Sequence, residues 1–430
     1  MAVNKKALFY VLLSVLFIGL SGYMHGYNPL LDNRLLPYDG VHMPAPTEEF
    51  SEYVAHNRAL IRAALVDLGY GSDRAANLTP YTLEELVDMR APFELSEAGA
   101  TCISSQAGAG KGFLLIHGLS DSPYLLRSVA QSLSEAFPCA LIRSLLTPGH
   151  GTVPGALLTV DRADWQQITT YGVNSFRQQV DELYVVGYSN GAALILDYLD
   201  NNRTEDLVQG LVFLSPGLRA INPQIVLAPY VKYFLHWVSR GEDTDAVKYE
   251  SFATNAAAEF HLLTRRLLSE SFSAIETPTL MVVSGDDSTI DAATTVDFFC
   301  DRIQSSRKTL LWYRSPVTET SPARNCSGIE VLNVESDLDR FVSHSHVSIS
   351  IPVTDPHYGL DSNYSQCLGY NEDPALFTAC LEDDDNTVYA EYTVRDSNGL
   401  YENKLVRRAT FNPLYPEMIT RISCFVNVEC

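Results

Sequence analysis

Short apolar runs alternate with longer segments of helical periodicity along most of the chain after residue 110. Short apolar runs bounded by turn residues are typical of buried strands, whereas apolar residues three and four positions apart indicate one face of a helix. Strands that alternate with helices pair in parallel, and the helices cover both faces of the sheet. The pattern therefore predicts an α/β fold with a mostly parallel sheet, with strands at residues 113–116, 139–146, 183–187, 211–214, 280–283, 309–313 and 329–334.

Three stretches depart from this alternation, one before and two within a main domain expected at 101–430. Residues 26–100 form a polar extension, in which apolar residues at helical spacing predict a helix at 48–68. At about 217–275 the strands stop and aromatic residues are frequent, which predicts an inserted helical cap; a pair of ordinary sheet-covering helices is the alternative. A loop-rich, acidic insertion is expected at about 351–405. Its Glu-Asp-Asp-Asp run at 382–385 is interpreted as a solvated loop, because nothing nearby supplies a cage of oxygen ligands.

Residues 7–22 form an uncharged run of 16 residues, and Lys5 and Lys6 precede it. The run is longer than the usual core of a signal peptide and slightly shorter than the roughly 20 residues that span a membrane. Positive residues keep that end cytoplasmic, so the rest of the chain would be exported. A clean small-x-small cleavage site is missing. This favours an inner-membrane anchor within residues 1–25, with the chain facing the periplasm, over a cleaved signal peptide and a periplasmic or secreted product.

Composition and charge narrow the class of protein. The 430 residues include 30 Lys and Arg against 52 Asp and Glu, a net charge of −22, which argues against nucleic-acid binding because attraction to phosphates needs a basic face. Eight cysteines in a chain expected to be exported predict disulfides, with Cys367–Cys380 and Cys424–Cys430 as local candidates. No cysteine pair has the C-x-x-C spacing of a zinc site, and no metal ligand is predicted.

The segment Gly187–Gly191 (GYSNG) carries the strongest chemical signal. It follows an apolar run and precedes a good helix former, so it predicts a strand, a sharp turn and a helix. A serine on such a turn is held in a strained backbone conformation that exposes its hydroxyl, and small residues two positions away on each side avoid a clash. Ser189 is therefore the candidate nucleophile.

A nucleophilic serine needs a base that accepts its proton and an acid that orients the base. The acid is expected after the run at 280–283, where Asp286 and Asp287 are adjacent. Asp287 is favoured because this turn has the form strand-G-x-x-D. With Ser284 at the position of the glycine, the acid of that pattern is residue 287. The base is expected within 343–348, where His346 is favoured and His344 is the alternative. Asp286 would then be a solvated or turn-bonding residue, and His344 a surface histidine.

Backbone amides are expected to stabilise the oxyanion that forms during attack. The candidates are the amide of Leu119, which follows the apolar run ending at Ile116, and the amide of Asn190, which follows the serine. His117 lies beside this loop and before the nucleophile in the chain. It is interpreted as a residue that orders the turn and not as the base.

Together these residues resemble the α/β-hydrolase superfamily, in particular bacterial carboxylesterases and monoacylglycerol-lipase-like or lysophospholipase-like serine hydrolases. The likeness covers about residues 110–350 and the last helix. It is further carried by the segments 115–118 (LIHG) and 148–152 (PGHGT), the second followed by Asp164-Trp165. Residues 407–418 are similar to the closing helix of the family, where Met418, Ile422 and Phe425 would cover the sheet.

The resemblance implies an α/β-hydrolase fold and an esterase or lipase-like hydrolase that forms an acyl-enzyme on Ser189, with Asp287 and His346 completing the triad. The substrate would be a small-molecule or lipid-like ester, and neither a metal nor an organic cofactor is implied. Thioester, peptide or acyl-transfer chemistry would use the same residues. A non-catalytic binding protein built on a hydrolase fold is the alternative from another class.

Overall fold

The computed structural model describes residues 32–40, 42–70, 79–96, 110–241, 243–316, 318–334, 340–362, 364–370, 372–396 and 404–428, together with Ser14 and Leu338. The predicted anchor or signal peptide within residues 1–25 lies, apart from Ser14, outside these residues. Among the described residues, no helix combines the length and the apolarity that a membrane span requires.

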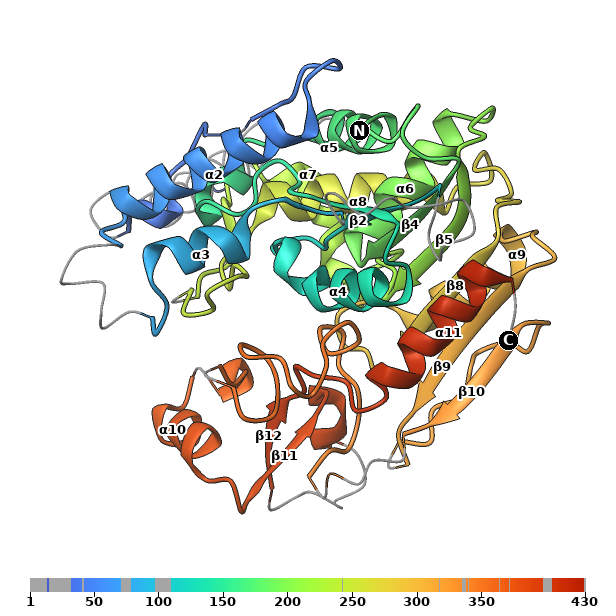
Figure 1. The fold of residues 1–430 in the computed structure, drawn as a ribbon. Coiled ribbons are helices and arrows are strands. Elements are labelled where there is room, and N and C mark those ends of the chain that lie inside the picture. The colour runs from blue at the N-terminus through green and yellow to red at the C-terminus, as the bar shows by residue number, and fades with distance from the viewer. Residues whose placement is uncertain are drawn as a thin grey trace, which may run out of the picture.

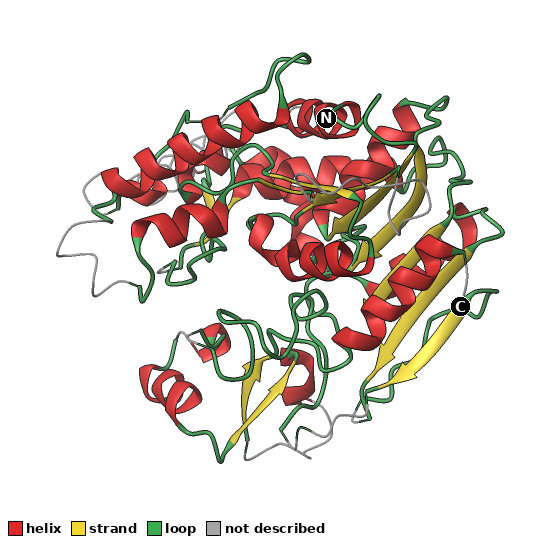
Figure 2. Ribbon diagram, in the orientation of Figure 1, coloured by secondary structure: helices red, strands yellow, loops and turns green. Residues whose placement is uncertain are grey.

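The centre of the molecule is a sheet of eight strands in the order β1, β3, β2, β4, β5, β8, β9, β10 (Figures 1 and 2). All neighbouring strands are parallel except β1 and β3, which are antiparallel. The strands are β1 (Phe93–Leu95), β2 (Lys111–Ile116), β3 (Leu141–Leu145), β4 (Glu182–Tyr188), β5 (Val208–Leu214), β8 (Thr279–Ser284), β9 (Lys308–Arg314) and β10 (Ile329–Asn333).

The prediction of a mostly parallel sheet is confirmed, and each of the seven predicted strands is present. The eighth strand, β1, was not predicted. It has only three residues, and its central Glu94 is exposed, so it contains no apolar run. These residues form a strand because they pair with β3, although their own sequence does not indicate one.

Alternate residues of the strands supply two hydrophobic cores, one on each face of the sheet. Leu114 and Ile116 of β2 pack in the core under α5 (Arg162–Asn174), α6 (Asn190–Asn201) and α9 (Ala292–Arg302). Phe113 and Leu115 pack in the other core, under α4 (Arg127–Ala136) and α11 (Tyr415–Asn427). Helices on both faces therefore hold the sheet, with α4 and α11 on the viewer's side in Figure 1.

The polar extension supplies two helices, α2 (Phe50–Asp67) and α3 (Leu83–Arg90), and α2 matches the helix predicted at 48–68. The Tyr53 hydroxyl of α2 donates to the Leu146 carbonyl at 2.8 Å and accepts from the Leu146 amide at 3.0 Å. These bonds join α2 to the segment that follows β3.

The segment between β5 and β8 contains η5 (Pro223–Leu227), α7 (Ala228–Val231), β6 (Trp237–Ser239), β7 (Phe252–Ala253) and α8 (Thr254–Leu267). The strands β6 and β7 form a separate two-stranded sheet. Trp237 is buried, whereas Tyr230, Tyr233 and Phe234 are 70, 69 and 53% exposed. The cap boundaries at about 217–275 stay a prediction.

The chain after β10 forms a lobe with α10 (Pro374–Glu382) and a two-stranded parallel sheet of β11 (Thr387–Ala390) and β12 (Leu405–Arg408) (Figure 1). The predicted closing helix at 407–418 is therefore wrong at its start. Arg407 and Arg408 belong to β12, because β11 offers them a parallel partner, and α11 begins only at Tyr415. Met418 and Ile422 are buried against the sheet as predicted, and Phe425 is partly buried.

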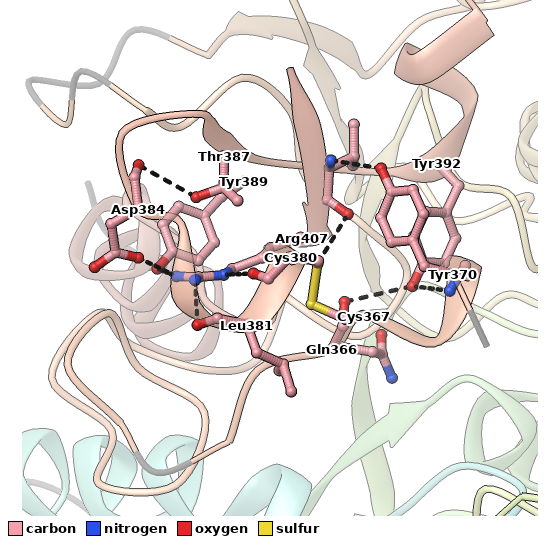
Figure 3. Close-up of a disulfide and its surroundings, with 12 residues drawn as sticks. Gln366, Cys367, Tyr370, Cys380, Leu381, Asp384, Thr387, Tyr389, Tyr392 and Arg407 are labelled. Carbon is pink, nitrogen blue, oxygen red and sulfur yellow. Dashed lines mark hydrogen bonds and ion pairs between the residues drawn. A yellow bond between two sulfur atoms is a disulfide. The ribbon is translucent and has the colours of Figure 1, made fainter. Parts of the chain in front are cut away.

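A disulfide between Cys367 and Cys380 joins this lobe internally, as predicted (Figure 3). Beside it, Arg407 donates to the carbonyls of Cys380 and Leu381 at 2.6 Å, and its guanidinium pairs with Asp384 at 2.6 Å. Asp384 belongs to the acidic run and has a side chain that is 64% exposed. The Asp384 carboxylate of the acidic run thus binds Arg407 and stabilises β12.

Cys300 and Cys326 form a second disulfide. Cys139 and Cys424 each take part in a further disulfide, with partners outside the described residues. Cys430 lies outside the described residues, so its predicted pairing with Cys424 stays a prediction. Disulfides persist in oxidising compartments, and these bonds therefore indicate an exported protein.

Candidate active site

Ser189 lies on the tight turn between β4 and α6, at the carboxyl end of the strand. Its backbone has φ 52° and ψ −116°, a conformation that non-glycine residues rarely adopt and that costs about 1–3 kcal/mol. A Cβ on Gly187 would lie 2.7 Å from the Ala192 nitrogen, and a Cβ on Gly191 would lie 2.0 Å from the Ile116 carbonyl oxygen. Both glycines are thus needed because backbone passes too close for a side chain.

The three predicted triad residues lie in one chain of hydrogen bonds. The Ser189 Oγ is 2.9 Å from the Nε2 of His346, whose Nδ1 is 2.7 Å from the Oδ2 of Asp287. The other carboxylate oxygen of Asp287 accepts from the amides of Thr289 and Ile290 at 2.8 and 2.9 Å. An ionised carboxylate only accepts hydrogen bonds, so Nδ1 carries the proton and the lone pair of Nε2 faces the serine hydroxyl.

Asp286 does not reach His346. It accepts a 2.5 Å hydrogen bond from the Thr318 hydroxyl and is 4% exposed, so of the two expectations, a solvated or a turn-bonding residue, the solvated one is wrong. Burial raises the pKa of Asp286 to about 6, although the bond from Thr318 opposes this shift. The turn after β8 points the Asp287 carboxylate toward His346 and the Asp286 carboxylate toward Thr318 in the interior.

His344 is also buried, so the expectation of a surface histidine is wrong. It is 1% exposed, its Nε2 is 2.7 Å from the Asn412 Oδ1, and its ring lies 4.5 Å from that of Tyr313. Burial lowers the pKa of His344 to about 4. The segment 341–351 is buried along its whole length, which leaves neither histidine at the surface.

An ion pair from the C-terminal lobe, between buried Glu391 and partly exposed Arg408, supports the His346 segment, and sequence reasoning missed it. Arg408 donates to Glu391 at 2.7 Å, and Glu391 Oε2 accepts from the backbone amide of His346 at 3.2 Å. Arg408 also donates to the Thr289 hydroxyl at 2.7 Å, in the turn that carries Asp287. Burial, the largest single influence, would raise the pKa of Glu391, but the Arg408 charge and the hydrogen bonds that the carboxylate accepts together outweigh it and lower this pKa. No local motif marks the pair.

The loop after β2 lies against the nucleophile turn. A Cβ on Gly118 would be 3.0 Å from the Cβ of Ser189. The Nε2 of His150 accepts from the Ser120 amide at 2.9 Å, and the Nε2 of His117 accepts from the Thr147 amide at 3.0 Å. The PGHGT segment and the LIHG segment thus fix each other. His117 is bonded within this loop structure, and the oxyanion roles of the Leu119 and Asn190 amides stay predictions.

A cavity of about 780 Å³ opens beside Ser189 and His346. Its lining includes two cationic side chains, Lys248, which pairs with Asp121, and Arg408, which pairs with Glu391. The wall supplied by the segment between β5 and β8 is mainly apolar and includes Ile221, Ile225, Leu227, Val231, Leu235, Val238, Phe252 and Phe260. Such a cavity offers space for an apolar group next to the serine hydroxyl.

The strand order, the antiparallel first strand and the strained serine turn after β4 define the α/β-hydrolase fold. The predicted fold class is confirmed. The chain therefore has the architecture of this superfamily.

No protein-family model matches the chain. The uncharacterized protein YnbC of Escherichia coli (strain K12) is 24% identical over 230 residues, which cover 48% of this chain and 38% of YnbC. The match thus spans less than two fifths of the length of that curated relative.

Solved structures of lipolytic enzymes are similar at low identity. The metagenome-derived lipolytic enzymes LipS and LipT are represented by a chain with 19% identity and a TM-score of 0.43, over 52% of this chain and 87% of that chain. The monoacylglycerol lipase of Paleococcus ferrophilus has 16% identity and a TM-score of 0.41, over 51% of this chain and 87% of that chain. A soluble variant of monoglyceride lipase from Saccharomyces cerevisiae has 14% identity and a TM-score of 0.41, over 52% of this chain and 82% of that chain.

Proposed function

We propose that the protein is a serine hydrolase that cleaves carboxylic esters through an acyl-enzyme on Ser189. The observation that carries the proposal is the continuous hydrogen-bond chain from Ser189 through His346 to Asp287. A serine hydroxyl needs such a base to become a nucleophile at neutral pH. The strained turn further supports this role, because backbone strain of this kind is concentrated at functional sites.

In the first half of the reaction, the Ser189 Oγ attacks the carbonyl carbon while its proton passes to the Nε2 of His346. Asp287 holds the imidazolium, and the amides of Leu119 and Asn190 donate to the oxyanion. The tetrahedral intermediate then breaks its bond to the alcohol oxygen, which takes the proton from His346. The alcohol leaves, and an ester between Ser189 and the acyl group remains.

In the second half, water attacks the acyl-enzyme as His346 accepts a proton from it. The bond between the acyl carbon and Ser189 Oγ breaks, the proton returns to Oγ, and the carboxylic acid leaves. All of these steps use side chains and amides of this chain.

An ester with an apolar acyl or alcohol group is the proposed substrate class. The cavity beside Ser189 has a mainly apolar wall, and its volume of about 780 Å³ is in the range of small-molecule sites. The similar solved structures are those of lipolytic enzymes, which favours the same class. We further propose that the chain acts outside the cytoplasm, held at the membrane by the apolar run at 7–22.

Covalent labelling with a fluorophosphonate probe tests the proposed nucleophile. We expect labelling of the unchanged protein, none of Ser189→Ala, and full labelling of Ser288→Ala, which removes another hydroxyl lining the same cavity. Labelling that persists in Ser189→Ala would refute the proposal that Ser189 is the nucleophile. A folded protein that takes up no probe would favour a binding protein on a hydrolase fold.

A further inference from the structure

Two histidines and one glutamate converge in the N-terminal extension, away from the triad. The Nε2 of His42 is 2.8 Å from the Glu48 Oε1, and the Nδ1 of His56 is 2.9 Å from the same oxygen. All three atoms lie within 4.8 Å of one another. The three residues come from a loop, from the turn before α2 and from the second turn of α2. Among the described residues, this is the one group of three such side chains close enough to share an ion.

We propose that His42, Glu48 and His56 form a binding site for a divalent transition metal, with Zn²⁺ as the favoured ion. Two imidazole nitrogens and one carboxylate oxygen are a ligand set that suits zinc, with water in the fourth position. A neutral imidazole can carry its proton on either nitrogen, so both rings can turn an unprotonated nitrogen toward the metal.

The two nitrogen–oxygen distances are close to those of a metal site, so small side-chain movements would admit the ion. With zinc–ligand bonds of about 2.0–2.2 Å and tetrahedral angles, neighbouring ligand atoms lie roughly 3.3 Å apart. The two nitrogen–oxygen distances of 2.8 and 2.9 Å therefore need to open by about half an ångström. The two rings are 4.6 Å apart and inclined at 54°, so their nitrogens approach the carboxylate from different directions.

The surroundings hold the carboxylate and leave one side open. Glu48 has a side chain that is 9% exposed, and its second oxygen accepts from the Ala45 amide at 3.3 Å. Its backbone carbonyl accepts from the Tyr171 hydroxyl of α5 at 3.1 Å. The His56 side chain is 58% exposed, which provides a path for the ion and a place for water. Such hydrogen bonds to a ligand fix its orientation and strengthen a metal site.

Occupation of this site would fasten the loop at His42 to α2 within the extension. A metal would join the loop at His42 to α2, while Glu48 remains bonded to α5 through Tyr171. Because the ligands are assembled only in the folded chain, the metal would stabilise the fold. The role is structural and independent of the proposed ester hydrolysis.

The test uses the full chain, purified through a tag without histidine and stripped with a chelator. Calorimetric titration with ZnCl₂ should give one Zn²⁺ per chain, and added zinc should raise the melting temperature. Glu48→Gln should weaken binding by more than tenfold, while its amide oxygen still accepts a hydrogen bond and preserves the fold. Glu49→Gln is the matched control, since it changes an exposed carboxylate one position away and should bind as the unchanged protein does.

Two further variants and a spectroscopic probe sharpen the result. His42→Ala and His56→Ala should each weaken binding, and Co²⁺ in the unchanged protein should show the visible bands of a tetrahedral site with nitrogen ligands. Equal zinc affinity in Glu48→Gln and Glu49→Gln would mean an adventitious ion only and would overturn the proposal. Absence of binding to the stripped, folded protein would overturn it as well.

Discussion

Removal of the Cys367–Cys380 disulfide should affect both stability and catalysis. The bond closes a loop with a sequence separation of 13 and holds the carbonyl of Cys380, to which Arg407 of β12 donates. The next residue, Arg408, forms the ion pair with Glu391 that supports the His346 segment. A looser β12 would therefore weaken the Arg408–Glu391 ion pair and, through it, the hydrogen bond that Glu391 accepts from the amide of His346, the proposed base.

The expected magnitudes follow from the loop length and from the lost hydrogen bond. Closing a loop of this size in the unfolded chain contributes about 3 kcal/mol to the free energy of unfolding. A hydrogen bond between the His346 amide and the Glu391 carboxylate is worth about 1.5–3 kcal/mol, and each ~1.4 kcal/mol of it that is lost in the transition state but not in the ground state lowers kcat about tenfold.

The Cys300–Cys326 disulfide provides the matched control. Its sequence separation is 26, so its removal should lower the free energy of unfolding by about 3.5 kcal/mol, slightly more than the first pair. Cys300 lies near the end of α9, whereas the turn carrying Asp287 precedes the start of that helix. This second pair should thus affect stability and leave kcat nearly unchanged.

The assay compares the two double cysteine-to-alanine variants by urea unfolding and by ester hydrolysis well below the unfolding transition. We expect similar losses of stability in both and a loss of kcat only when Cys367 and Cys380 are replaced. An unchanged kcat in that variant would refute the link from the C-terminal lobe to His346. Equal losses of kcat in both variants would show a general effect of lower stability.

Four other substitutions test individual residues of the site. His346→Ala should lower kcat by several powers of ten, because the base is lost, while His344→Ala should leave kcat within about tenfold; steady-state kinetics that rank them in reverse would move the base to His344. Asp286 has a pKa of about 6 in the folded chain against about 3.9 unfolded, so its contribution to stability is present below pH 4 and lost as the pH rises through 6. The free energy of unfolding of Asp286→Asn relative to the unchanged protein should therefore increase by about 2 kcal/mol from pH 4 to pH 8, and a difference that stays constant in urea titrations would contradict this. Gly191→Ala would place a Cβ 2.0 Å from the Ile116 carbonyl, so it should abolish hydrolysis and lower the melting temperature, and a fully active, equally stable variant would show that the turn can relax.

Features with local signals could be predicted from the sequence. The seven longer strands are apolar runs, and buried parallel strands have this pattern on both faces. The serine turn is marked by Gly187 and Gly191, and the close backbone contacts at both positions explain why glycine stands there. Because the carboxyl ends of parallel strands share one edge of the sheet, residues after β4, β8 and β10 could be expected to meet there.

Features that depend on distant partners could not be predicted. Arg408 forms part of a strand because β11 lies beside it, and its ion pair with Glu391 joins residues 17 positions apart within an insertion without periodicity. Likewise, Asp286 and His344 read as exposed polar residues, yet the lobe that follows β10 buries the segments around them. His42, Glu48 and His56 have no recognised ligand spacing, and only the folded extension brings them together.

Hydrolysis of a series of esters with acyl chains of increasing length, by the unchanged protein and by Ser189→Ala, tests the central claim most directly. The account predicts turnover by the unchanged protein, with a preference for an apolar chain that fits the cavity, and a loss of several powers of ten in kcat for the variant. Hydrolysis that continues at the same rate in Ser189→Ala, or no turnover of any ester by the folded protein, would contradict it.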